Sequence, residues 1–115
     1  MDEYEPKEQN LSSSPIPKKS NITLQQAIEF GEYNPDVLQN FAEWHTISVH
    51  IQWQLIRKAL DIRDRQLILQ YAELNNALNL SKKPYVREAI KNVERQLRDL
   101  AKDKERLYVE YSNKM

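Results

Sequence analysis

The clearest hydrophobic pattern lies in the last third of the chain, where apolar residues recur at alternating intervals of four and three. The series is Val86, Ile90, Val93, Leu97, Leu100, Lys104, Leu107 and Tyr111, with one lysine at an apolar position. This spacing keeps the side chains on one narrow face of an α-helix, as in helices that pack against a single partner helix. We therefore predict a helix over residues 84–112 with one apolar seam.

The middle of the chain carries a wider apolar face. One helical series consists of Val49, Trp53, Ile56, Leu60, Asp64, Leu67, Tyr71, Leu74 and Leu78, and a second series of Ile47, Ile51, Leu55, Ala59, Ile62 and Leu69. We predict a helix over residues 46–79, roughly 50 Å long at about 1.5 Å per residue. A single partner helix covers only one such stripe, so this helix must contact more than the last helix.

A turn separates the two long helices. The sequence NLSKKP breaks the helical pattern, because Asn79 can end one helix, Ser81 can cap the next and Pro84 suits a first helical turn. The two helices should therefore form an antiparallel hairpin.

A short helix is predicted before the hairpin, over residues 24–30. Thr23 and Gln26 match the capping box that begins a helix. The only glycine of the chain, Gly31, directly follows the predicted end, where a residue often adopts the left-handed conformation that glycine tolerates best. Gly31 is therefore expected to end this helix in a tight corner.

A second short helix is predicted over residues 35–44. Asn34 is a favourable N-cap, and Pro35 suits the first helical position. Thr46 and Ser48 can both act as caps, so we predict a joint near residues 45–48. The alternative is one continuous helix from Pro35 onward.

Residues 1–20 differ from the rest of the chain in composition. They contain three prolines and a run of serines, with too little apolar area to offset the entropy of ordering. We predict a disordered leader over 1–20 and one helical domain over 21–115. The expected fold class is all-α, an antiparallel, coiled-coil-like hairpin of two long helices with one or two short N-terminal helices.

Charge and cysteine content bear on where the protein is located and what it contacts. The chain has 17 basic and 17 acidic residues, but residues 21–44 carry four acids and no base, and residues 81–115 carry ten bases and six acids. There is no cysteine, so we expect a reducing, cytoplasmic location. No apolar run approaches the roughly 18 residues of a membrane span, so no membrane partner is expected.

The sequence contains no recognisable catalytic, cofactor or metal-binding motif, and we expect a protein that is not an enzyme and has no cofactor. His45 and His50 would lie about 140° apart on a helix and could not share a metal ion. Asp64 falls in an apolar series, where a salt bridge that fixes helix register is favoured over a catalytic site in a helical bundle.

The surplus apolar stripe of the middle helix predicts an interface. Five aromatic residues of the front half are expected to fill a small core: Phe30, Tyr33, Phe41, Trp44 and Trp53. The candidate protein interface consists of Trp44, Ile51, Leu55, Ile62 and Leu69. We expect a homodimer or higher oligomer that acts as a helical interaction, scaffold or regulatory module, with a protein partner whose identity the sequence does not give.

A basic face on the last helix supports an alternative function. The side chains of Arg87, Lys91, Arg95, Arg98 and Lys102 would lie along one side. Such a face would suit a nucleic-acid-associated regulator, although the sequence pI of about 6.7 is below that of most nucleic-acid-binding domains.

Overall fold

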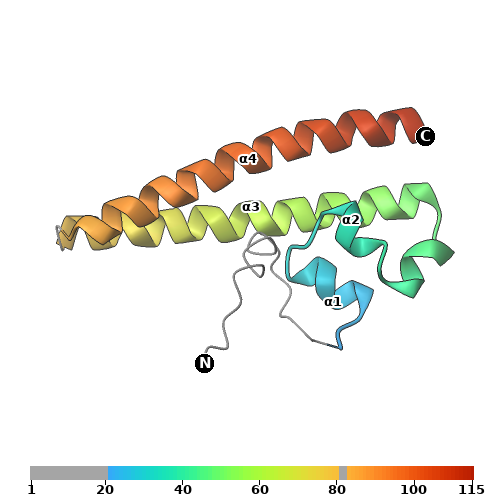
Figure 1. Cartoon of the computed structure of the whole chain (residues 1–115), viewed down its shortest axis with the longest axis horizontal. Helices are drawn as coiled ribbons and strands as arrows, with labels where there is room; N and C mark the ends of the chain where they lie inside the picture. The colour runs from blue at the N-terminus through green and yellow to red at the C-terminus, as the bar shows by residue number, and fades with distance from the viewer. Residues whose placement is uncertain (1–20, 81–82) are drawn as a thin grey trace, which may run out of the picture.

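The chain forms an all-α antiparallel hairpin with short helices packed at one end. The computed structural model describes residues 21–80 and 83–115, and the predictions for the leader and for Ser81 lie outside these residues. The elements are α1 (Leu24–Glu29), α2 (Pro35–Leu38), the 3₁₀ helix η2 (Ala42–Thr46), α3 (Val49–Leu80) and α4 (Pro84–Lys114). Figure 1 shows α3 and α4 along the length of the molecule, with α1 and α2 beside the N-terminal half of α3.

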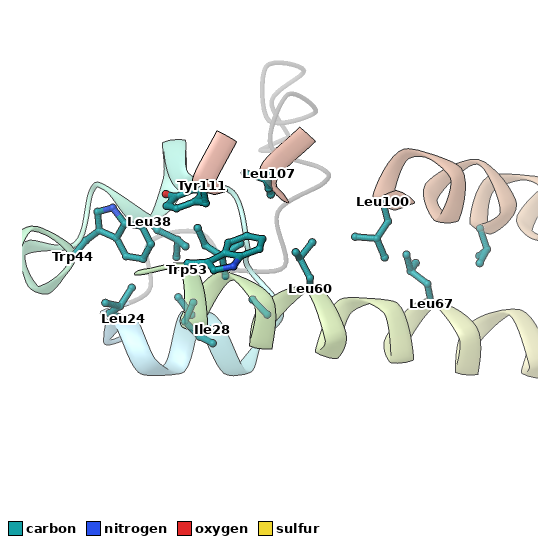
Figure 2. Close-up of a cluster of buried hydrophobic side chains, with 14 residues drawn as sticks. Leu24, Ile28, Leu38, Trp44, Trp53, Leu60, Leu67, Leu100, Leu107 and Tyr111 are labelled. Carbon is teal, nitrogen blue, oxygen red and sulfur yellow. The ribbon is translucent and has the colours of Figure 1, made fainter. Parts of the chain in front are cut away.

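The predicted seam of α4 packs against α3. Buried seam residues are Val86, Ile90, Val93, Leu100, Leu107 and Tyr111, and Leu97 and Lys104 are partly buried. The facing series of α3 buries Trp53, Ile56, Leu60 and Leu67. Leu67 of α3 and Leu100 of α4 point toward each other in Figure 2. The sequence pattern therefore identified the packed faces of both long helices.

The corner after α1 confirms the role predicted for Gly31. Thr23 and Gln26 form the capping box at the start of α1. At its end, the amide of Gly31 donates to the carbonyl of Ile28 at 2.9 Å, and the amide of Glu32 donates to the carbonyl of Ala27 at 3.0 Å. These two bonds define a Schellman motif, in which the glycine takes a positive φ, here 95°. The only glycine therefore occupies the conformation that glycine alone adopts at little cost.

The prediction of one helix over residues 35–44 is wrong beyond the first turn. Asn34 caps α2 as predicted, with its side chain accepting from the amide of Asp36, but α2 ends at Leu38 and η2 follows. Leu38 and Trp44 are both buried in the core. On one unbroken helix these residues would lie about 120° apart. Breaking the helix between them allows both side chains to turn toward the core.

A joint separates η2 from α3, and it lies where Thr46 and Ser48 indicated a break. The hydroxyl of Thr46 donates to the carbonyl of Glu43 at 2.8 Å, and the hydroxyl of Ser48 accepts from the amide of Ile51 at 3.2 Å. The long helix consequently begins at Val49 rather than at residue 46, and it extends to Leu80.

The core is concentrated where the short helices meet the hairpin. Trp53 stacks on Tyr111 with ring centroids 5.3 Å apart and meets Tyr108 edge-on at 4.9 Å. Leu38 and Trp44 belong to the same cluster (Figure 2). The segment before α3 therefore packs at the open end of the hairpin, where the beginning of α3 meets the last turns of α4.

Candidate protein interface

Helix α1 covers part of the second apolar series of α3. Ala59, in the middle of this series, is fully buried, and Leu55 is partly buried against the core. Leu69, farther along the helix, exposes 65% of its surface. The cover supplied by α1 therefore ends before the apolar series does.

A hydrogen-bond chain fixes where α1 ends on α3. Arg63 donates from Nη1 to Oε1 of Gln66 at 3.0 Å, and Nε2 of Gln66 donates to the carbonyl oxygen of Phe30 at 3.0 Å. The Gln66 amide thus satisfies a carbonyl that the end of α1 would leave without a helical partner. This contact places Phe30 beside the turn of α3 that carries Gln66.

An exposed apolar patch surrounds this contact. Phe30 is 40% exposed, and on α3 the partly buried Ile62 and the exposed Leu69 lie one turn before and one turn after Gln66. We call Phe30, Ile62 and Leu69 the α3 patch. Ile68 is also exposed, but one residue corresponds to about 100° around a helix, so it lies on another side of α3.

The other predicted interface residues lie apart from this patch. Trp44 exposes only 5% of its surface and belongs to the core, where it is not accessible to a partner. Ile51 is 43% exposed near the start of α3, one turn before Leu55. The structure therefore brings Ile62 and Leu69 together with Phe30, and separates Trp44 from them.

A shallow depression lies nearer the start of α3, and its last lining residue on that helix, Lys58, is one turn before Ile62. It has a volume of about 490 Å³ and lies between α1, η2 and α3. Its lining consists of Thr23, Leu24, Gln25, Ile28, Glu43, Leu55 and Lys58. Its walls combine the apolar residues Leu24, Ile28 and Leu55 with the charged residues Glu43 and Lys58.

The predicted basic face lies opposite the seam of α4. Its five side chains, from Arg87 to Lys102, are all exposed. Among the described residues, Arg95 donates to Asn92 at 2.7 Å, and the other four form no hydrogen bond or ion pair. The ion pairs of α4 instead join Arg106 to Asp103 and Lys114 to Glu110. These four cations are therefore available to an external anion.

The three titratable residues considered in the sequence analysis lie on two elements: His45 on η2, and His50 and Asp64 on α3. His45 contacts the carbonyl of Gln39 at 2.6 Å, and His50 is exposed. The salt bridge expected at Asp64 is wrong for the described residues, among which this partly buried carboxylate forms no hydrogen bond or ion pair. Within residues 21–80 and 83–115, no three His, Cys, Asp or Glu side chains come together in a way that would hold a metal ion.

Phe30 is the one residue of the α3 patch that the sequence analysis did not assign to the candidate interface. It was assigned to the aromatic core, where Trp44 and Trp53 are indeed buried and Tyr33 and Phe41 pack against the cluster. Phe30 is the C-cap of α1, directly before Gly31. Its backbone is fixed by the Schellman corner, which the sequence predicts, and by the contact with Gln66, which has no signature in residue spacing.

The comparisons with known proteins give no further guidance. No protein-family model, curated protein or solved structure matches the chain. Among the helices of the described residues, none combines the length and apolar character needed to cross a membrane.

Proposed function

We propose that this chain is a non-enzymatic helical interaction module that self-associates through the α3 patch and thereby scaffolds or regulates a protein partner. The observation that carries the proposal is the 65% exposure of Leu69 beside Phe30 and Ile62. Leaving apolar surface in water forgoes about 25 cal/mol per Å², so covering the patch would be favourable.

A second copy is the favoured cover for the patch. Two-fold self-association is the most common protein assembly, and it needs only one self-complementary surface. The chain has no net charge, so two copies do not repel each other over long distances. The coiled-coil-like character of the long helices fits such helix-to-helix contact. We propose a cytoplasmic location, because cytoplasmic proteins rarely depend on disulfides and this chain has no cysteine.

Sedimentation equilibrium of the full chain at tens of micromolar tests this function. We expect a dimer mass for the parent chain and a monomer mass for Leu69→Glu, because the new charge would be buried unpaired in the interface. Ile68→Glu is the matched control, since it changes an exposed apolar residue one position away and should leave the dimer intact. A monomeric parent chain would contradict self-association.

The exposed cations of α4 favour a second candidate function, contact with a polyanion such as nucleic acid. If all five side chains met phosphates of duplex DNA, the logarithm of the binding constant would fall by about four to five per tenfold increase in salt. Retention on a nucleic-acid column at two salt concentrations measures this dependence. Weak retention at low salt, or retention unaffected by Lys91→Glu and Arg95→Glu, would exclude this use of the basic face.

A further inference from the structure

The α3 patch is flanked by opposite charges on the same side of α3. Lys58 precedes Ile62 by four residues, and Glu73 follows Leu69 by four residues, so each charge lies one helical turn from the patch. Both side chains are exposed and, among the described residues, neither forms an ion pair. Along this stripe the order is therefore positive, apolar, apolar, negative.

We propose that two copies of the chain pair through antiparallel α3 helices, in the register that sets Ile62 of each copy against Leu69 of its partner. This inference rests on the proposed function, because it identifies how a second copy would cover the α3 patch. In antiparallel helices, four residues back in one copy correspond to four residues forward in the other. Lys58 therefore faces Glu73 of the partner, and two-fold symmetry forms both contacts twice.

The position of α1 selects this register over its neighbours. Helix α1 runs beside α3 from Leu55, which shares the depression with Leu24, to Gln66, which contacts the corner at Gly31. In the proposed register residue 66 faces residue 65 of the partner, so the two α1 helices meet end to end. Pairing Ile62 with itself would shift the copies by one heptad and place the two α1 helices over the same length of the dimer.

The opposite shift loses the apolar match. Pairing Leu69 with itself would place Ile62 against the polar Asn76, and it would set Glu73 against Arg65 instead of Lys58. The proposed register also sets the turn of the partner's α3 that begins at Glu73 over the depression beside Leu55 and Lys58. Apolar contact, charge and shape therefore agree in one arrangement.

Disulfide trapping tests the register, because the natural chain contains no cysteine. Lys58→Cys combined with Glu73→Cys should yield a covalent dimer under mild oxidation, seen on a non-reducing gel. The two cysteines of one chain would lie about 22 Å apart on α3, far beyond the roughly 7 Å that a disulfide can bridge. In the proposed register the two copies of residue 58, or of residue 73, lie equally far apart along the paired helices, so each single variant should remain uncross-linked.

The controls separate the register from self-association itself. Ile62→Cys combined with Leu69→Cys should cross-link as well, which repeats the test with both charges retained. Addition of Leu69→Glu to the Lys58→Cys and Glu73→Cys pair should abolish the covalent dimer. Cross-linking of a single-cysteine variant as readily as the double variant would indicate parallel helices and overturn the proposal. A dimer by sedimentation that neither cysteine pair traps would overturn the register alone, and a monomer by sedimentation would overturn the proposed function with it.

Discussion

The hydroxyl group of Tyr33 donates a hydrogen bond to Oδ2 of Asp103 at 2.7 Å, across a separation of 70 residues. Tyr33 lies in the corner between α1 and α2, and Asp103 lies on α4. This bond joins the short helices to the last helix, whereas Gln66 joins them to α3. The N-terminal segment is therefore attached to both helices of the hairpin.

Loss of this bond should weaken the protein measurably. Tyr33→Phe removes the donor and leaves a partly buried carboxylate with fewer partners, so we expect about 1–2 kcal/mol lower stability in urea unfolding. Tyr85→Phe is the control, because Tyr85 is exposed and its hydroxyl forms no hydrogen bond among the described residues. Equal stability of the Tyr33 and Tyr85 variants would show that the bond contributes nothing.

Tyr33 should also make the protein sensitive to alkali. Burial, followed by the hydrogen bond to Asp103, raises the pKa of Tyr33 above the ordinary tyrosine value of 10.0. The folded state therefore keeps its proton while the unfolded state loses it, so the stabilisation is complete below about pH 10 and is lost as pH rises from there toward the folded-state pKa. Burial also raises the pKa of Tyr111. Urea unfolding at stepped pH should show this loss, and Tyr33→Phe should reduce it.

Gly31→Ala should destabilise the protein by at least about 1 kcal/mol, and Gly31→Val by more. The φ of 95° strains any side chain, and an added Cβ would lie 3.2 Å from Oε1 of Gln66 and 3.5 Å from Cα of Arg63. Thermal unfolding followed by circular dichroism measures the change. An unchanged or higher melting temperature for the alanine variant would contradict the left-handed corner.

Leu97→Asp should disrupt the hairpin, because it places an unpaired charge in the seam between α3 and α4. Leu97 is partly buried against the core cluster. Ala101→Asp adds the same charge at an exposed position one turn later and should cost only a few tenths of a kcal/mol from helix propensity. Circular dichroism and urea unfolding should distinguish the two variants, and similar behaviour would contradict the seam.

The capping box of α1 should behave as one unit. The amide of Gln26 donates to the Thr23 hydroxyl at 3.1 Å, and the amide of Thr23 donates to the Gln26 side chain at 2.9 Å. Thr23→Ala should cost about 1 kcal/mol. The double variant with Gln26→Ala should cost less than the sum of the single changes, because each residue supports the other. Strict additivity in a double-mutant cycle would show that the two bonds act independently.

Residue spacing predicted the hairpin because its helices are long and their apolar positions repeat many times. The prediction that the eight seam positions of α4 are buried or partly buried was correct, because the burial of each side chain depends mainly on its angular position around the helix axis. The corner at Gly31 was predictable for another reason, since a single glycine after a capped helix has a specific conformational use.

The short elements were less predictable because packing, rather than local preference, decides their ends. Helix α2 stops at Leu38 so that Leu38 and Trp44 can both reach the core. Phe30, which was expected in the core, is exposed, whereas Trp44, which was expected both in the core and in the candidate interface, is buried. Both outcomes depend on how the N-terminal segment crosses α3 and α4, and no pattern within that segment contains this information.

The uneven distribution of the core implies an order in which the structure opens. Around Trp53 and Tyr111 the short helices support the hairpin. Toward the turn between α3 and α4, the two long helices pack only on each other within the part of the chain that the structure describes (Figure 1). Amide hydrogens near Leu74 and Ala89 should therefore exchange with solvent sooner than those near Ile56 and Leu107. Fraying would begin at the turn and stop at the aromatic cluster, so that the N-terminal segment and the last turns of α4 come apart together in one cooperative step.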